Sequence, residues 1–235
     1  MGAEQLALGL LWYVAFLLSA TCHEAAHALA AKWGGDPTAY YYGQVSLSPA
    51  PHLQREPFGM VVVPWLSFLL SGWMMGWASA PYDPLWARRH PNRSGWMALA
   101  GPVANYILVI LAGIVIQMCL RFGLFQMPGS LNFSRLVDAG DGLGAGFATF
   151  LSILFSLNLL LGTFNLLPLP PLDGFSVLNI FLPESMAHSL MDLRDSLGPY
   201  LMLGMFVAWK IFDYVYFPVF AVALRVLYPG ELFGR

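Results

Sequence analysis

Residues 6–31 read LALGLLWYVAFLLSATCHEAAHALAA, an apolar run that ends in two histidines and a glutamate. A helix needs about 20 apolar residues to cross the roughly 30 Å hydrocarbon core of a bilayer, and this run is long enough. Residues 1–5 contain Glu4 and neither Lys nor Arg, which is unlike the start of a secretory signal peptide. The run therefore predicts a membrane helix with ionisable side chains near its end.

The composition of the whole chain is typical of an integral membrane protein. Of 235 residues, 58% are hydrophobic and 10% are charged, whereas an average soluble domain is about 25% charged. The formal net charge is −2 without a basic stripe, which excludes a nucleic-acid-binding protein. Two cysteines are too few for a disulfide framework or a cysteine-rich metal module. We expect one polytopic domain over residues 1–235, with a core at residues 6–182 and a C-terminal helical region at 183–235.

Other segments add membrane helices and one extended stretch. Residues 37–48 (PTAYYYGQVSLS) alternate in part between Tyr or Val and small polar residues, which favours a strand or short hairpin. Within the apolar segment at residues 200–227, Lys210 and Asp213 are expected to form an intrahelical pair. A role in a proton relay is the alternative. Further apolar segments lie at residues 60–80, 96–120, 146–167 and 200–227.

The polar end of the first apolar run has the pattern His23-Glu24-Ala25-Ala26-His27. On a helix, residues four apart lie about 40° from each other around the axis, so both imidazoles face one point. Two neutral imidazoles at this spacing suit Zn²⁺, and Glu24 beside them can accept a proton from water. Ionisable groups at membrane depth mark functional sites. The pattern therefore predicts a metal site.

Asp173 is the candidate for a third protein ligand, which a catalytic zinc site needs beside an open position for water. It follows the run Asn165-Leu-Leu-Pro-Leu-Pro-Pro-Leu, in which the prolines end the preceding helix. Gly174 then allows a sharp turn beside the carboxylate. Capping of the short apolar segment at 174–182 is an alternative role for Asp173, and it is compatible with metal binding.

Three motifs occur in order along the chain: His23-Glu24-x-x-His27, Ala100-Gly101-Pro102-x-Ala104-Asn105 and Asn165-Leu-Leu-Pro…Leu172-Asp173-Gly174. Together they resemble the site-2 protease family of intramembrane zinc metalloproteases. The resemblance extends from residue 6 to residue 182, and residues 34–49 look like the compact branch, which lacks PDZ and nucleotide-binding regulatory domains. Residues 52–57 (HLQREP) depart from the His-x-Asp-Pro run of compact members, so His52 is either a site residue or an interfacial polar residue.

The resemblance implies an activity and a role for each matching residue. His23, His27 and Asp173 match the ligands of one Zn²⁺, and Glu24 matches the general base. Asn165 matches an asparagine that binds substrate or steadies the oxyanion, and Asn105 matches the polar residue of the second motif, a candidate substrate contact. The implied reaction is hydrolysis of peptide bonds within or near transmembrane segments of a protein substrate, in the lipid bilayer of the cell membrane.

The predicted strand offers a way to hold such a substrate. A helical substrate must unwind before its carbonyls can be attacked, and the unwound segment can then pair with a strand edge. We expect Tyr41, Gly43 and Val45 to contact it. The alternative is that the strand only covers the site.

A shared metal ion also constrains the topology. If His27 and Asp173 reach one ion from the ends of two helices, residues 60–80 must enter and leave the membrane on the same side, as a re-entrant segment or broken hairpin. The sequence thus predicts an all-α polytopic membrane protein with about five to six membrane helices, a short membrane-associated β-hairpin and a re-entrant segment. By the positive-inside rule the metal side is cytoplasmic. That side has Lys32, Arg55, Arg88, Arg89, Arg93 and Arg194, and the other side has Arg121, Arg135, Arg225 and Arg235.

Two other classes of function stay open. A cation transporter or channel would need acids along a path through the membrane, whereas here they converge on one side. A catalytically idle family member that binds membrane partners would not need Glu24.

Overall fold

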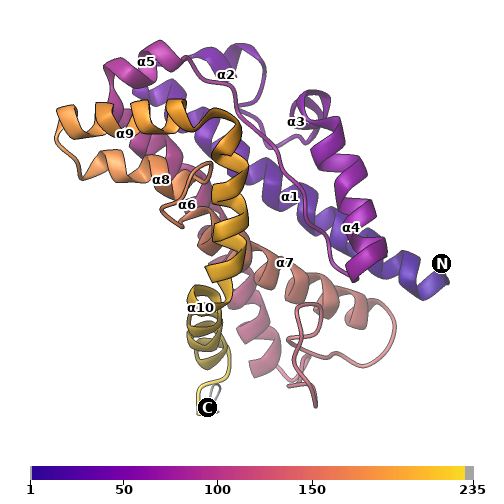
Figure 1. Cartoon of the computed structure of the whole chain (residues 1–235). Helices are drawn as coiled ribbons and strands as arrows, with labels where there is room; N and C mark the ends of the chain where they lie inside the picture. The colour runs from indigo at the N-terminus through magenta and orange to yellow at the C-terminus, as the bar shows by residue number, and fades with distance from the viewer. Residues whose placement is uncertain (1, 231–235) are drawn as a thin grey trace. The chain divides into compact units, whose positions relative to one another are not determined.

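The computed structural model describes residues 2–230, apart from the side chains of residues 199 and 202 (Figure 1). Arg235, counted above with the basic residues, lies outside this range. The described chain divides into two compact units, which we treat separately. Unit 1 comprises residues 1–21, 47–79 and 105–159, and unit 2 comprises residues 22–46, 80–104 and 160–235. Three long helices contribute residues to both units: α1 (Ala3–Gly34), α6 (Pro91–Arg121) and α7 (Leu143–Asn165).

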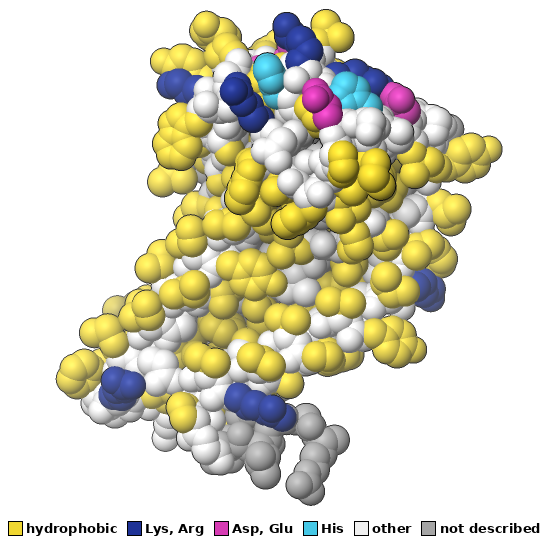
Figure 2. All heavy atoms as spheres, turned by 90° about the vertical axis from the view of Figure 1, so that its left-hand side faces the viewer, with side chains coloured by type: hydrophobic (Ala, Val, Ile, Leu, Met, Phe, Trp, Pro, Cys, Tyr) yellow, Lys and Arg dark blue, Asp and Glu magenta, His cyan; other side chains and the backbone are white. Residues whose placement is uncertain are grey.

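Within residues 2–230, four helices are long and apolar enough to cross a membrane, so the expected five to six spans are not confirmed. The difference arises largely at residues 60–80, where the apolar helix Phe58–Ser71 is too short to cross alone. Figure 2 shows hydrophobic side chains over most of the face in view, while the visible His, Asp and Glu side chains gather near its upper end. The four helices are Ala3–Gly34, Pro91–Arg121, Leu143–Asn165 and Leu203–Leu227.

In unit 1, the chain reverses within residues 60–80. Gly72 ends the apolar helix in the left-handed conformation, with φ of 80°, which glycine adopts without strain. The returning chain lies against the helix, because the Trp77 N–H donates to the Gly59 carbonyl at 3.2 Å and the Met75 N–H donates to Ser67 Oγ at 3.0 Å. Residues 60–80 therefore fold back on themselves. The short helices here are α3 (Ala50–Arg55), the π-helix η1 (Phe58–Val62) and α4 (Val63–Ser71).

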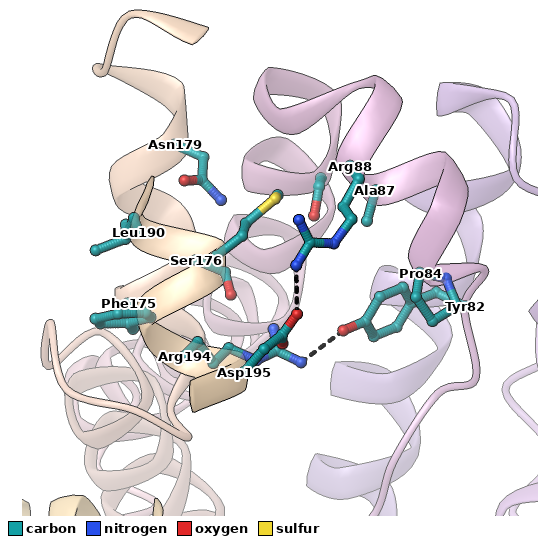
Figure 3. Close-up of a pocket in the computed structure, with 12 residues that line it drawn as sticks. Tyr82, Pro84, Ala87, Arg88, Phe175, Ser176, Asn179, Leu190, Arg194 and Asp195 are labelled. Carbon is teal, nitrogen blue, oxygen red and sulfur yellow. Dashed lines mark hydrogen bonds and ion pairs between the residues drawn. The ribbon is translucent and has the colours of Figure 1, made fainter. Parts of the chain in front are cut away.

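Unit 2 contains the remaining helices, and ion pairs tie two of them together. Arg88 on α5 donates to Asp192 at 2.8 Å and to Asp195 at 2.6 Å, both on α9. Arg194 of α9 donates to the Tyr82 hydroxyl at 2.7 Å, beside a cavity of about 40 Å³ (Figure 3). The helices are α2 (Thr38–Tyr41), α5 (Pro84–Arg89), α8 (Asp173–Val177), η2 (Leu178–Ile180), α9 (Glu184–Leu197), η3 (Gly198–Tyr200) and α10 (Leu201–Leu227).

The predicted strand at residues 37–48 is wrong, because residues 38–41 form the one-turn helix α2. Gly43, with φ of 72°, ends this turn in a Schellman motif. Its N–H donates to the Tyr40 carbonyl at 2.9 Å, and the Gln44 N–H donates to the Ala39 carbonyl at 3.0 Å. These local bonds use the backbone groups that a strand would offer to a neighbour, and no strand is assigned among residues 2–230.

The three residues predicted to contact substrate through that strand have other positions. Tyr41 ends α2 and is 79% exposed, and Gly43 lies in the turn that follows. Val45 is half-buried in irregular chain. These residues therefore offer no strand edge to a substrate, and contact of Tyr41, Gly43 and Val45 with substrate stays a prediction.

Candidate metal centre

The two histidines of the HExxH pattern come together one turn apart on α1. His23 and His27 are buried, with exposed fractions of 7% and 8%. Their Nε2 atoms lie 2.9 Å apart, and the rings meet edge to face at 83°. The helical spacing of four residues therefore brings both nitrogens to one point, as the sequence predicts.

Asp173 completes the cluster from the first position of α8. Its Oδ2 lies 3.1 Å from His23 Nε2 and 3.4 Å from His27 Nε2. Gly174 makes this position possible, because a side chain there would collide with the backbone carbonyls of residues 166 and 167. The backbone of residues 166 and 167 therefore packs directly against Gly174, the residue after the aspartate.

The three ligand atoms fit a zinc ion. Ligand atoms about 2.0–2.1 Å from a tetrahedral ion stand about 3.3–3.4 Å from one another, close to the 2.9, 3.1 and 3.4 Å found here. Among the residues the structure describes, His23, His27 and Asp173 form the one group of three or more such side chains that could hold a metal. His52, on α3 of unit 1, is buried and is not part of that group.

A backbone contact orients the His27 ring. Its Nδ1–H donates to the Met97 carbonyl of α6 at 2.7 Å. In a neutral imidazole this leaves the lone pair on Nε2, the atom that faces His23 and Asp173. Met97 carries no sequence signal for this role, because its contribution comes from the main chain.

The electrostatics of the cluster favour an ionised carboxylate. Burial acts to raise the pKa of the Asp173 carboxyl, but its interaction with the two imidazoles, 3.1 and 3.4 Å from Oδ2, lowers that pKa by more. The pKa of Asp173 therefore lies below its usual range, and its carboxyl is ionised at neutral pH. Glu24 is buried on α1 between the two histidines, and Asn165 is the half-buried last residue of α7.

Gly101 is a further residue of this centre, and the sequence shows it only as part of the second motif. An ideal Cβ at Gly101 would overlap His27 Nε2 and would lie 2.6 Å from His23 Nε2. The α6 backbone therefore closes directly on both imidazoles, and the position accepts no side chain without displacing them.

Replacing Gly101 by Ala is expected to lower zinc affinity by at least about tenfold, because the methyl group pushes the ligand nitrogens apart. The measurement is zinc competition against a chelator of known affinity. Gly2→Ala is the matched control, since a Cβ at Gly2 meets no atom within 4 Å. An affinity for Gly101→Ala equal to wild type would show that the imidazoles do not occupy this position in the bound state.

Asn105 lies in unit 1, in a buried hydrogen-bond network. Its Nδ2 donates to Asn158 Oδ1 at 2.8 Å, and Asn158 Nδ2 donates to Ser19 Oγ at 2.8 Å. All three residues are fully buried. The network joins α6, α7 and α1 inside unit 1, which gives Asn105 a packing role, while substrate binding by Asn105 stays a prediction. Asn158 is not among the residues identified from the sequence, although an Asn near the middle of the apolar segment 146–167 is a recognisable signal.

Replacing Asn158 by Leu is expected to lower the free energy of unfolding by about 1–3 kcal/mol, because the Asn105 amide loses a partner in an apolar interior. Denaturant unfolding in detergent micelles measures the change. The double variant N105L/N158L should lose less than the sum of the two single variants, since both polar partners leave together. Unchanged stability of Asn158→Leu would contradict a packing role for this network.

Comparison with known proteins agrees with the geometry of this centre. The model of peptidase family M50 matches residues 11–207, which include all three motifs. A protein of Bacillus subtilis (strain 168) named "Putative zinc metalloprotease YwhC" is 31% identical over 207 residues, covering 88% of this chain and 84% of that protein. No solved structure matches the chain. On the extent of the family match, this chain belongs to peptidase family M50, the site-2 protease family of membrane zinc metalloproteases.

Proposed function

We propose that this chain is an intramembrane zinc endopeptidase that hydrolyses peptide bonds within or near transmembrane segments of substrate proteins. The observation that carries the proposal is the convergence of His23 Nε2, His27 Nε2 and Asp173 Oδ2. Helices long enough to span a bilayer support the membrane setting. The family supports peptide hydrolysis as the reaction.

In the proposed centre, the imidazoles of His23 and His27 and the carboxylate of Asp173 would hold the ion, with room left for water. Zn²⁺, when bound, lowers the pKa of water to about 7 and polarises the scissile carbonyl. The Met97 carbonyl keeps the His27 ring in the orientation and tautomer that this requires. Gly101 leaves room for both rings.

Glu24 is the proposed general base. It accepts the proton of the attacking water and passes it to the leaving amide nitrogen. The burial of Glu24 supports this role. Few water molecules hydrate a buried carboxylate, so its oxygens are available to accept a proton. Asn165 is proposed to donate an amide hydrogen bond to the developing oxyanion, a kind of contact worth about 2.7–4 kcal/mol in other enzymes.

The test uses the full chain in lipid vesicles together with a reporter that contains a cleavable membrane segment. The zinc-loaded protein should cleave the reporter, chelation should stop cleavage, and zinc should restore it. Cleavage that survives chelation would contradict the proposed chemistry. Metal-dependent ion flux without cleavage would instead favour a transporter, and neither flux nor cleavage would favour an idle family member.

We further propose that the metal centre lies nearer the cytoplasmic face of the cell membrane. The basic residues support this, and Arg89 of α5 is well exposed for labelling. In a chain without Cys22 and Cys119, an impermeant thiol reagent added to intact cells should label a cysteine at exposed Ser130 and spare a cysteine at Arg89. Labelling at position 89 alone would reverse the orientation.

A further inference from the structure

The last helix has two different faces. Gly204, Ala208, Phe212 and Tyr216, spaced four residues apart on α10, face the interior of unit 2. Gly204 is so close to the Pro170 carbonyl that a Cβ there would overlap the oxygen. The opposite stripe is exposed and consists of Phe206, Lys210, Asp213, Tyr214 and Phe217.

This stripe holds two opposite charges inside a candidate membrane span. Lys210 and Asp213 both lie within Leu203–Leu227 and are exposed. Lys210 is about 10 Å along the helix from the start of the span, at a rise of about 1.5 Å per residue. Residues this far in are surrounded by lipid tails unless protein covers them, and a charge facing lipid is strongly disfavoured.

The charges do not satisfy each other in the structure. The predicted intrahelical pair is absent: neither Lys210 nor Asp213 forms an ion pair with any residue between 2 and 230. The Lys210 ammonium lies 5.5 Å from the centre of the Phe206 ring, a weak cation–π contact. Whatever covers this stripe must therefore bring both a negative and a positive group.

We propose that the stripe is the contact surface of a homodimer, and that its occupant is α10 of a second copy of this chain. The proposal does not depend on peptidase activity. A two-fold axis along the membrane normal would set Lys210 of each copy beside Asp213 of the other, giving two reciprocal ion pairs. The lysine side chain is long enough to bridge the about 4.5 Å of helix rise between the two positions.

Charge complementarity favours a second copy over an unrelated helix. An unrelated membrane helix would need an acid and a base at matching depths, whereas a second copy has both by its own sequence. Phe206, Tyr214 and Phe217 flank the charges with large exposed rings. Rings of this kind are enriched in protein interfaces and would shield the ion pairs from lipid.

The experiment measures energy transfer between copies with donor and acceptor labels in vesicles at a fixed protein-to-lipid ratio. Wild type should show transfer that unlabelled wild type competes away. Lys210→Asp gives two negative charges on the stripe and Asp213→Lys gives two positive charges, so each variant alone should lose at least about tenfold in association. A mixture of the two variants should regain association, because the opposite charges then meet between copies.

Two controls keep the outcome decisive. K210M/D213L removes both charges, inserts into the membrane at least as well as wild type, and should still lose association. Arg121→Asp and Asp141→Lys make the same charge changes at exposed positions outside α10 and should keep it. Full energy transfer in K210M/D213L, or none in the mixture while zinc content is normal, would overturn the proposal. Transfer absent from wild type would also overturn it and would point to another membrane partner.

Discussion

Glu24→Gln is expected to bind about one zinc ion per chain and to cleave the membrane-segment reporter about 10²–10⁴-fold more slowly than wild type. Gln keeps the size of the side chain but cannot accept the proton of the attacking water. His23, His27 and Asp173 stay in place, so the loss should fall on turnover and not on metal content. Rates from single-turnover cleavage in vesicles, with zinc measured in the same samples, separate the two effects.

Glu184→Gln is the matched control for this prediction. Glu184 is a glutamate at the start of α9 in the same unit, with its side chain 75% exposed, and the same substitution there should leave cleavage at the wild-type rate. Equal rates for Glu24→Gln and wild type would remove Glu24 from the mechanism. A loss of zinc from Glu24→Gln would mean that the residue supports the metal instead.

Asp173→Ala removes a proposed zinc ligand. Loss of a residue that only hydrogen-bonds to a ligand weakens metal binding by about 10–100-fold, and we expect loss of the ligand itself to weaken zinc binding by more than that. The variant removes the carboxylate whose Oδ2 lies 3.1 Å from His23 Nε2 and 3.4 Å from His27 Nε2. A zinc site with two protein ligands is open to water on two sides and should also lose cleavage. Zinc competition and reporter cleavage measure the two losses.

Asp192→Ala controls for removal of an aspartate from unit 2. Asp192 lies on α9, where it accepts a hydrogen bond from Arg88. Since Asp192 is exposed and is not part of the group that could hold a metal, the zinc affinity of Asp192→Ala should match wild type. Zinc affinity of Asp173→Ala equal to that of Asp192→Ala would show that another group completes the site.

The part of the site that could be predicted is the part that is local in sequence. His23 and His27 are one helical turn apart, so their convergence follows from the geometry of a helix. Asp173 is 150 residues from His23, and spacing alone could not join them. It could be identified because a zinc site needs a third ligand, few acids lie at helix ends, and the motif around it resembles a known family.

The rest of the fold and of the candidate site depends on contacts that no local sequence pattern encodes. The partial alternation at residues 37–48 is compatible with a strand, but Gly43 closes a Schellman turn that competes with it. The reversal within residues 60–80 could be predicted, because Pro64, Gly72 and Gly76 interrupt the apolar run. The approach of Gly101 to the imidazoles, the Met97 carbonyl contact and the Asn105–Asn158 bond are tertiary, so only the structure reveals them.

The central claim is that His23, His27 and Asp173 bind one zinc ion together. X-ray absorption at the zinc edge, on the full chain loaded with one equivalent of zinc, tests it most directly. The expected spectrum shows two imidazole nitrogens and light oxygen ligands at about 2.0–2.1 Å. Scattering from sulfur at about 2.3 Å, or from fewer than two imidazoles, would contradict the claim.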